Sequence, residues 1–267
     1  MPDVHDALLI ALVCAVCSLD LISAFQVMVS RPLVVGVLLG AVLGDPGTGL
    51  ASGMILELIW LQQIEVGSVV PPDFTLGAAI AAGGAVLLRR WHPEISREAC
   101  VAATLLASVP VAWMGGVANL WQRRRHAGLA AWAENALEKK GDESALAKAV
   151  AMSLGLTFIN AFVLAMLGLL LVVPALSSLM GSLSTAVLGA LGGLYWLALL
   201  LGFAVLVDHF WQGRWFRIFG TSFVLAALAS SYAGLSGGAL LGISVAVGIG
   251  LAFVGLSLAD AAQEGPS

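Results

Sequence analysis

Three carboxylates and two amides lie within one short stretch of an otherwise apolar chain, LELIWLQQIEVGSVVPPDF at residues 56–74. Glu57 is flanked by apolar residues on both sides, and Glu65 and Asp73 follow it. A carboxylate at the centre of a bilayer costs roughly 2.5–3.5 kcal/mol on insertion scales, so such residues usually face a protein interior or a water-filled cavity. Carboxylates and amides together accept and donate hydrogen bonds to many hydroxyl groups. This chemistry suits the binding of a sugar.

The same stretch contains a helix followed by a helix break. On a helix, Glu57, Leu61 and Glu65 fall near one face, because each is four residues from the next and side chains at that spacing lie above one another. Gly67, Pro71 and Pro72 then interrupt the helix and free backbone donors and acceptors. A broken helix is tolerated in a membrane where it is buried or lines a cavity, and transporters use such breaks as binding sites.

Each carboxylate also has a simpler interpretation. Asp73 follows two prolines and precedes an apolar run, so it is equally consistent with a helix N-cap. Glu65 is equally consistent with a position in water at the membrane surface. For Glu57 we favour a functional role, because its neighbours Leu56 and Leu58 are apolar.

The composition is that of a membrane protein. Hydrophobic residues make up 60% of the chain and charged residues 10%, whereas a soluble domain carries about a quarter charged residues. The net charge of −4 gives no reason to expect nucleic acid as a partner. The start of the chain is acidic and does not resemble a removable signal peptide.

No catalytic residue, metal site or cofactor is predicted. Cys14 and Cys17 form a C-x-x-C inside an apolar helix, where we expect them to contribute to packing. Ser236 lies in GLSGG, which resembles a serine-nucleophile motif, but no histidine follows His209 to act as its base.

The apolar segments predict an all-α, polytopic membrane protein with about 7–10 transmembrane and re-entrant helices, formed by residues 1–267 as a single domain. The segments lie at about 7–29, 32–44, 48–64, 74–88, 99–120, 150–173, 185–207, 216–233 and 237–258. Gly36, Gly40 and Gly44 form a small-residue ridge that should contact another helix. The turn GDPGTG at 44–49 predicts a helical hairpin. Residues 121–148 are the one strongly charged segment, and they predict an amphipathic helix on the membrane surface.

RPLVVGVLLGAVLGDPGTG at 31–49, followed by LELIWLQQIEVGSVVPPD at 56–73, resembles the membrane subunit IIC of the mannose–fructose–sorbose family of the bacterial phosphotransferase system. The family pattern runs from Arg-Pro through a Leu-Gly-Asp turn to a Leu-Glu, and then to a Gly-Ala-Ala-Val-Ala-Pro-Asp element. It falls without a gap on Arg31, Pro32, Gly44, Asp45, Gly49, Glu57, Gly67, Val70, Pro72 and Asp73.

The resemblance implies a non-catalytic, sugar-translocating permease subunit in the bacterial cytoplasmic membrane. It implies a mobile core that moves against a scaffold in a trimer of IIC–IID pairs. Soluble IIA and IIB subunits would carry the phosphoryl group from phosphoenolpyruvate, and IIB would phosphorylate the sugar as it emerges. The predicted sugar-binding residues are Glu57, Gln63, Glu65, Gly67 and Asp73.

The chain departs from the family pattern at one place. Mannose-type members carry Gly-Trp-Met-Asn between the glutamate and the glycine, where this chain has Gln62-Gln63-Ile64-Glu65. The resemblance therefore implies a hexose-like sugar without specifying mannose. Two other functions remain open: a membrane assembly or regulatory subunit that has lost transport, and an ion-coupled secondary transporter that uses the same carboxylates.

Overall fold

The computed structural model of the chain describes residues 4–22, 24, 26–61, 71–210, 214–232, 243, 245–251 and 254. All regular structure in these residues is helical, as the sequence predicted for an all-α membrane protein. The chain divides into two compact units, residues 1–203 and 204–267. The prediction of one domain over the whole chain stays a prediction.

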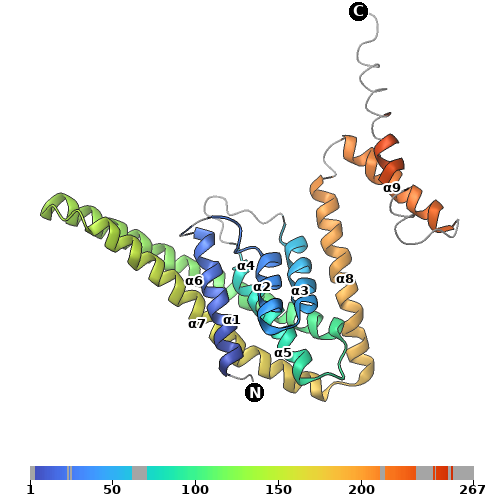
Figure 1. The fold of residues 1–267 in the computed structure, drawn as a ribbon, viewed down its shortest axis with the longest axis horizontal. Helices are drawn as coiled ribbons and strands as arrows, with labels where there is room; N and C mark the ends of the chain where they lie inside the picture. Colours follow the sequence, from blue (N-terminus) through green and yellow to red (C-terminus); the bar gives the residue numbers. More distant parts are fainter. Residues whose placement is uncertain are drawn as a thin grey trace, which may run out of the picture. The chain divides into compact units, whose positions relative to one another are not determined.

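The first unit contains most of the helices (Figure 1). They are α1 (Val4–Ile22), α2 (Pro32–Leu43), α3 (Pro46–Ile59), α4 (Phe74–Ala78), the π-helical turn η1 (Ala79–Gly83), α5 (Gly84–Trp91), α6 (Arg97–Lys140) and α7 (Ala145–Ser182). Helix α8 (Thr185–Phe210) begins in this unit and crosses the division between the units. The second unit contains α9 (Arg214–Tyr232), and a side chain added at Gly248 would lie 2.9 Å from the ring of Phe219 in the same unit.

Three of the described helices are long and apolar enough to cross a membrane. These spans are Arg97–Lys139, Ala145–Ser182 and Thr185–Val207. Helix α2 is apolar but shorter, with 12 residues, which is the length expected of a re-entrant or buried half-helix.

One helix lies at the centre of the first unit. Residues 74–88, which form α4, η1 and most of α5, are buried at every position, with α1, α2, α3, α6 and α7 packed around them. Their sequence is apolar and rich in alanine and glycine, and a helix that is apolar on all sides is buried. The π-helical turn in its middle is a form that occurs frequently near functional sites.

Helices α2 and α3 contact each other through glycines on both sides. A side chain at Gly36 would lie 2.8 Å from the Cα of Gly53, and one at Gly40 would lie 3.0 Å from the Cα of Gly49. The prediction that Gly36 and Gly40 contact another helix is confirmed, and that helix belongs to the same chain. Gly44 does not take part, because it ends α2 in the left-handed conformation with φ of 83°, which glycine adopts without strain.

The end of this hairpin is fastened by arginines from α5. Nη1 of Arg89 donates to Oδ2 of Asp45 at 3.1 Å, and Asp45 also caps α3 by accepting from the N–H of Thr48. Nη2 of Arg90 donates to the carbonyl oxygen of Leu43 at 2.7 Å. The turn GDPGTG is therefore a helical hairpin turn, as predicted, and it is held to the central helix.

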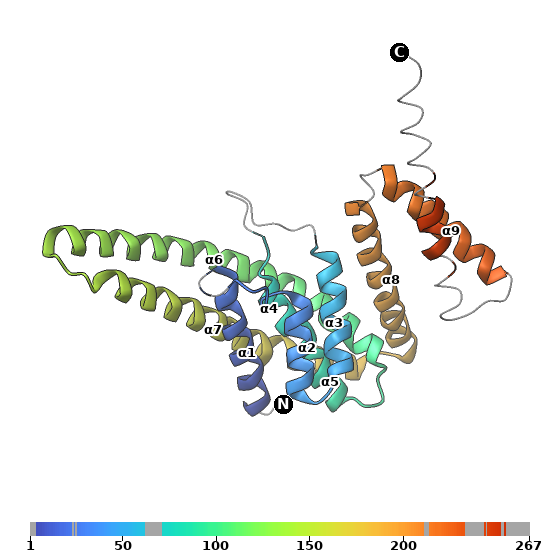
Figure 2. The ribbon, with the colours of Figure 1, turned by 45° about the horizontal axis from the view of Figure 1, so that its top comes forward.

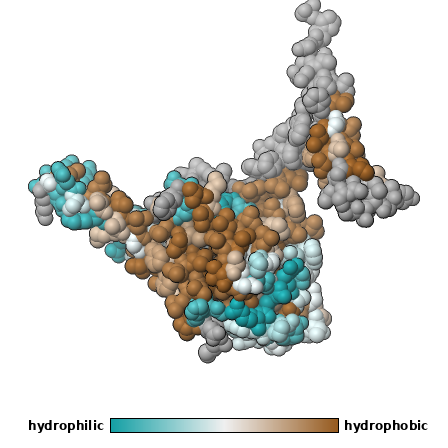
Figure 3. Space-filling model, viewed as in Figure 1, coloured by the Kyte–Doolittle hydropathy of each residue, from teal (hydrophilic) through white to brown (hydrophobic). Residues whose placement is uncertain are grey.

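The charged segment 121–148 begins as the continuation of α6. Residues 121–140 extend this helix without a break up to Gly141, whose φ is 61°. No proline or glycine pair interrupts the helix in this part, so it continues beyond the apolar stretch. Its outer half runs beside the start of α7, and the two project away from α1–α5 as an arm (Figures 1 and 2). Hydrophilic residues gather at the tip of this arm, while its base is hydrophobic (Figure 3). The position of the arm at the membrane surface stays a prediction.

Candidate functional site

The helix ends on either side of segment 62–70 contact each other. The ring of Trp60, directly after α3, lies 5.3 Å from the ring of Phe74 at the start of α4. A side chain at Gly77 would lie 2.7 Å from the Trp60 ring, so glycine permits this contact. The carboxylates of Glu57 and Asp73 therefore come from neighbouring helix ends.

Glu57 is bound to the first residues of α2. The Nε of Arg31 donates to its Oε1 at 2.8 Å, and the Nη2 of Arg31 donates to the same oxygen. The N–H of Leu33 donates to Oε2 at 3.3 Å. The N-terminus of a helix carries unpaired N–H groups and partial positive charge, and Pro32 has no N–H to offer, so Leu33 provides the donor. The side chains of Arg31 and Glu57 are 31% and 18% exposed. Glu57 is therefore a paired carboxylate in a partly buried position.

The loop before α2 is held by Asp20 at the end of α1. Its Oδ1 accepts from the N–H of Val27 at 2.7 Å, and its Oδ2 accepts from the N–H of Ser30 at 3.3 Å. Gln26 and Met28 in this loop have φ of 52° and 65°. Left-handed backbone is unusual for such residues and persists where the surrounding structure imposes it, often at functional sites. Asp20 thus fixes the loop that leads into α2.

The start of α4 reaches the same loop, because Oγ1 of Thr75 donates to the carbonyl oxygen of Ser30 at 3.1 Å. Four helix ends therefore meet at one end of the first unit: the C-terminal ends of α1 and α3 and the N-terminal ends of α2 and α4 (Figures 1 and 2). Between them they bring together Asp20, Arg31 and Glu57, with Asp73 at the start of α4.

Asp73 is a buried N-cap, with 6% of the residue exposed. Its Oδ1 accepts from the N–H of Leu76 at 2.9 Å, and its Oδ2 accepts from Nδ2 of Asn119 on α6 at 3.2 Å. Its own N–H donates to the carbonyl oxygen of Ala112 at 2.8 Å. The N-cap interpretation is confirmed, while a contact between Asp73 and a sugar stays a prediction.

Two glycines on α6 allow Pro71 and Asp73, just before α4, to pack closely against this helix. A side chain at Gly115 would lie 2.6 Å from Cβ of Asp73, and one at Gly116 would lie 2.7 Å from the carbonyl oxygen of Pro71. The pair Gly115–Gly116 therefore sets how closely the start of α4 sits against α6.

Behind Asp73 lies a polar cluster between α1, α6 and α7. Nε2 of Gln122 donates to Oγ1 of Thr157 at 2.7 Å, and Nδ2 of Asn160 donates to Oε1 of Gln122 at 2.9 Å. The cluster encloses a cavity of about 10 Å³, lined by Ser18, Asp73, Asn119, Gln122, Thr157, Asn160 and Ala161. One water molecule needs roughly 10–15 Å³. A sugar ring therefore does not fit inside this cluster as it stands.

Three of the five predicted sugar-binding residues, Gln63, Glu65 and Gly67, lie outside the described residues. Of the other two, Glu57 bonds to the start of α2 and Asp73 bonds to α6. Sequence reasoning missed Asp20, a carboxylate near the end of an apolar helix. The argument used for Glu57, that a carboxylate among apolar residues usually faces the protein interior or a cavity, applies to Asp20 as well.

The cysteines behave as predicted, because Cys14 and Cys17 are buried as free thiols. Within the described part of the chain, no group of three or more His, Cys, Asp and Glu side chains could hold a metal ion.

Comparison with known families gives a match over most of the chain. The model of the sorbose-specific IIC component of the phosphotransferase system matches residues 4–248. The putative N-acetylgalactosamine permease IIC component 2 of Escherichia coli (strain K12) is 31% identical over 81 residues, which are 30% of this chain and 60% of that protein. The aligned stretch thus spans less than two thirds of this relative.

Two solved structures share the fold. A membrane protein aligns with a TM-score of 0.63 and 23% identity, covering 88% of this chain and 98% of the other. A chain of the mannose transporter ManYZ, solved in complex with microcin E492, aligns with a TM-score of 0.54 and 22% identity, covering 88% and 96%. These similarities extend over most of both chains, and they concern the fold.

Proposed function

Because the chain belongs to the family of sorbose-specific IIC components of the phosphotransferase system, we propose that it is the sugar-carrying membrane subunit of such a system in a bacterial cytoplasmic membrane. In this role it binds a hexose-like sugar and releases it to a IIB subunit, which phosphorylates it. Phosphoryl transfer takes place on IIA and IIB, and this chain moves the sugar. Its membrane partner is a IID subunit, in a trimer of IIC–IID pairs.

The observation that carries the proposal is the meeting of four helix ends around Arg31 and Glu57. Broken helices with polar ends are how transporters build binding sites in a membrane. A guanidinium has five N–H donors, and a carboxylate has about four acceptor positions. The Arg31–Glu57 pair uses two of those donors and, with the N–H of Leu33, three of those acceptor positions. Among the residues that the structure describes, the pair therefore leaves three donors and about one acceptor position for the hydroxyl groups of a sugar.

In the proposed site, Glu57 binds hydroxyl groups, and Gln63 and Glu65 adjust which sugar fits. Gly67 lets the backbone approach the sugar. Asp73 closes the segment at its far end, where its hydrogen bonds to Leu76 and Asn119 hold α4 in place. Because the cavity behind Asp73 has room for about one water, the sugar lies outside this polar cluster.

The family points to a class of sugar. The family description names sorbose, one relative is described as a permease for N-acetylgalactosamine, and one structural neighbour is a mannose transporter. All three are hexoses or hexose derivatives, so the substrate class proposed for this chain is a hexose or amino sugar.

The function is tested in membrane vesicles that contain this chain together with its IID, IIB and IIA partners. A panel of labelled hexoses and amino sugars is offered with and without phosphoenolpyruvate. We expect one sugar to accumulate as its phosphate, and only when phosphoenolpyruvate is present. Assembled complexes that phosphorylate no sugar would favour a subunit without transport, and uptake that needs a proton gradient instead would favour a secondary transporter.

The site is tested by Glu65→Gln and Gln63→Ala in the same vesicles. A hydrogen bond to a charged group contributes roughly 1.5–3 kcal/mol, so Glu65→Gln should weaken sugar binding about tenfold to a hundredfold at 1.4 kcal/mol per decade. Asp142→Asn, in the loop between α6 and α7, is the matched control. Equal affinity in all three variants would contradict the proposed site while leaving the transport function intact.

A further inference from the structure

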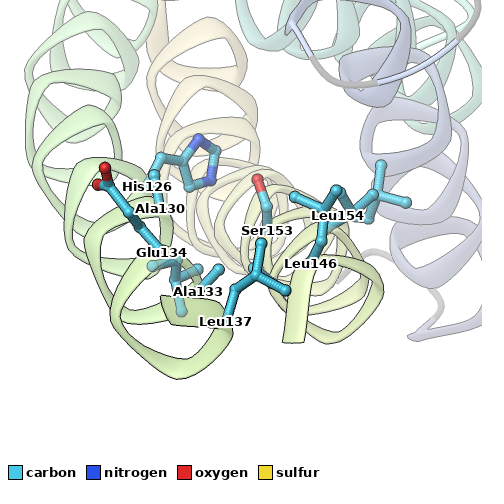
Figure 4. A pocket seen from close by; sticks show the side chains of 11 residues that line it. His126, Ala130, Ala133, Glu134, Leu137, Leu146, Ser153 and Leu154 are labelled. Atoms are coloured by element: carbon cyan, nitrogen blue, oxygen red, sulfur yellow. The ribbon is translucent and has the colours of Figure 1, made fainter. Parts of the chain in front are cut away.

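The arm formed by α6 and α7 carries two grooves that the proposed sugar site does not use. The smaller has a volume of about 380 Å³ and is lined by Arg124, Arg125, Gly128, Leu129, Met152 and Leu156. The larger, of about 490 Å³, lies between the outer half of α6 and the start of α7 (Figure 4). Leu129 lines both grooves, so apolar surface continues from one to the other.

The smaller groove has two arginines at one end. Arg124 and Arg125 are both exposed, and neither forms an ion pair with a carboxylate among the residues that the structure describes. The Cζ of Arg125 lies 4.8 Å from the ring centroid of Trp121, and such a cation–π contact holds a guanidinium in place. The other lining residues are Gly128 and three apolar residues, Leu129, Met152 and Leu156. A Cβ added at Gly128 would meet no atom within 4 Å, so the groove is open there.

These arginines occur where α6 changes from apolar to charged. Residues 99–121 contain no charged side chain, and at 1.5 Å per residue they extend about 35 Å. This exceeds the roughly 30 Å thickness of the hydrocarbon core of a bilayer. Tryptophan and arginine together mark the level of the lipid headgroups. Trp121 and the arginines that follow it match this signature.

We propose that the groove at Arg124 and Arg125 binds an anionic phospholipid. The two guanidinium groups hold the headgroup phosphate, and an acyl chain lies along Leu129, Met152 and Leu156. The proposal is independent of which sugar the chain carries.

The chemistry favours this ligand for two reasons. The planar guanidinium presents paired N–H donors that match the oxygens of a phosphate, and basic pockets between membrane helices bind anionic headgroups. The apolar lining beside the arginines then requires a ligand with a hydrocarbon part. A phospholipid with a net negative charge satisfies both requirements, whereas a soluble phosphate satisfies only the first.

Native mass spectrometry of the purified full-length chain tests the proposal. The protein is titrated with phosphatidylglycerol or with phosphatidylcholine carrying the same acyl chains, and the lipid adducts are quantified. Two arginines beside the headgroup should favour phosphatidylglycerol about thirtyfold, which corresponds to about 2 kcal/mol at 1.4 kcal/mol per decade. Equal binding of the two lipids by the unmodified chain would overturn the proposal.

Variants locate the site. R124Q/R125Q should lose the preference for phosphatidylglycerol, while R124K/R125K should keep part of it, because the charges remain but the paired N–H donors of the guanidinium are lost. K139Q/K140Q, which removes the adjacent pair of cations at the end of the same helix, should leave the preference unchanged. Loss of preference in K139Q/K140Q, or its retention in R124Q/R125Q, would contradict the assigned site.

Two further measurements separate the parts of the ligand. Gly128→Leu adds an apolar side chain to the lining of the groove, at a position where the added Cβ meets no atom within 4 Å, and it should weaken phosphatidylglycerol binding several-fold. Gly189→Leu on α8, where the space is also open, is its control. Millimolar glycerol phosphate should not displace the lipid, and displacement would show that the site binds a phosphate without a hydrocarbon chain.

Discussion

Arg31 and Glu57 form an ion pair that joins the start of α2 to the end of α3. Glycines on both helices also allow α2 and α3 to pack closely. Both Arg31 and Glu57 belong to the pattern on which the sequence resembles the family, and in the structure they contact each other. The pair closes the α2–α3 hairpin at the end that carries segment 62–70. Arg31 brings the positive charge, and the N-terminus of α2 adds its own N–H groups around the same carboxylate.

We expect Glu57→Gln to lower both the stability and the sugar affinity of the protein. The change removes the charge opposite Arg31, and an uncompensated charge in a partly buried position is destabilising. From sequence alone, a sugar-binding Glu57 predicted normal expression of this variant with weaker sugar binding, and a Glu57 paired with a nearby arginine predicted poor expression with little effect on affinity. The ion pair with Arg31 supports the loss of stability, and the contact with a sugar stays a prediction. Thermal unfolding and sugar binding are measured on the same preparation.

A double-mutant cycle separates the pair from the sugar contact. Arg31→Gln, Glu57→Gln and the double variant should show a coupling energy of about 0.5–3 kcal/mol in stability, because the two side chains touch. If Glu57 binds the sugar directly, the double variant recovers part of the stability but none of the affinity. Recovery of both would mean that Glu57 acts only through Arg31.

Gly40→Leu should prevent normal folding of the chain. A side chain at this position would lie 2.8 Å from the carbonyl oxygen of Asp45 and 3.0 Å from the Cα of Gly49, and backbone atoms cannot move aside cheaply. From sequence alone, this variant was expected to disrupt either folding or association with IID, and the structure favours folding. Gly193→Leu on α8 is the control, because the space there is open. The melting temperatures of the two purified variants are compared with that of the unmodified protein. A Gly40→Leu protein with an unchanged melting temperature would contradict the observed hairpin.

The sequence was sufficient to predict those parts of the fold that depend on local patterns. The turn GDPGTG after α2 and the close helix contact at Gly36 and Gly40 were predicted, since each depends on neighbouring residues. Gly44 was predicted to join that contact, and instead it ends α2. Glu57 was recognisable because a carboxylate stands out among apolar residues. The amides Asn119, Gln122 and Asn160 were not recognisable, because they lie on two long helices whose relative register no local pattern specifies. The sequence also did not indicate that the charged residues 121–140 continue the apolar helix before them, since a change from apolar to charged residues does not specify where a helix ends.

The loop between α6 and α7 should respond to acid. The hydrogen bond from Ser144 and the contact with Lys148 hold the pKa of Asp142 below its ordinary value of 3.8. A depressed pKa in the folded state contributes stability that is present above the ordinary pKa and is lost as the pH falls through the depressed one. The protection factors of the Ser144 and Ala145 amides, which compare the observed exchange rate with the intrinsic rate at the same pH, should therefore be higher at pH 5 than below pH 3. In Asp142→Asn this change between the two pH values should be absent, and an equal change in both proteins would assign it to another group.

Two glycines on α6 should respond differently to the same substitution. At Gly115, a methyl group would lie 2.6 Å from Cβ of Asp73 and 2.8 Å from Cδ2 of Leu76, so Gly115→Ala must displace the start of α4. Overpacking of this kind costs typically 1–3 kcal/mol.

At Gly128 no atom lies within 4 Å of the added group, and replacing glycine by alanine within a helix stabilises it by about 0.8–1 kcal/mol. Gly115→Ala should therefore melt earlier than the unmodified protein and bind sugar more weakly, because Asp73 moves away from Asn119. Gly128→Ala should melt at the same temperature or later, with unchanged sugar affinity. Equal melting temperatures for the two variants would mean that the close contact between α4 and α6 does not position Asp73.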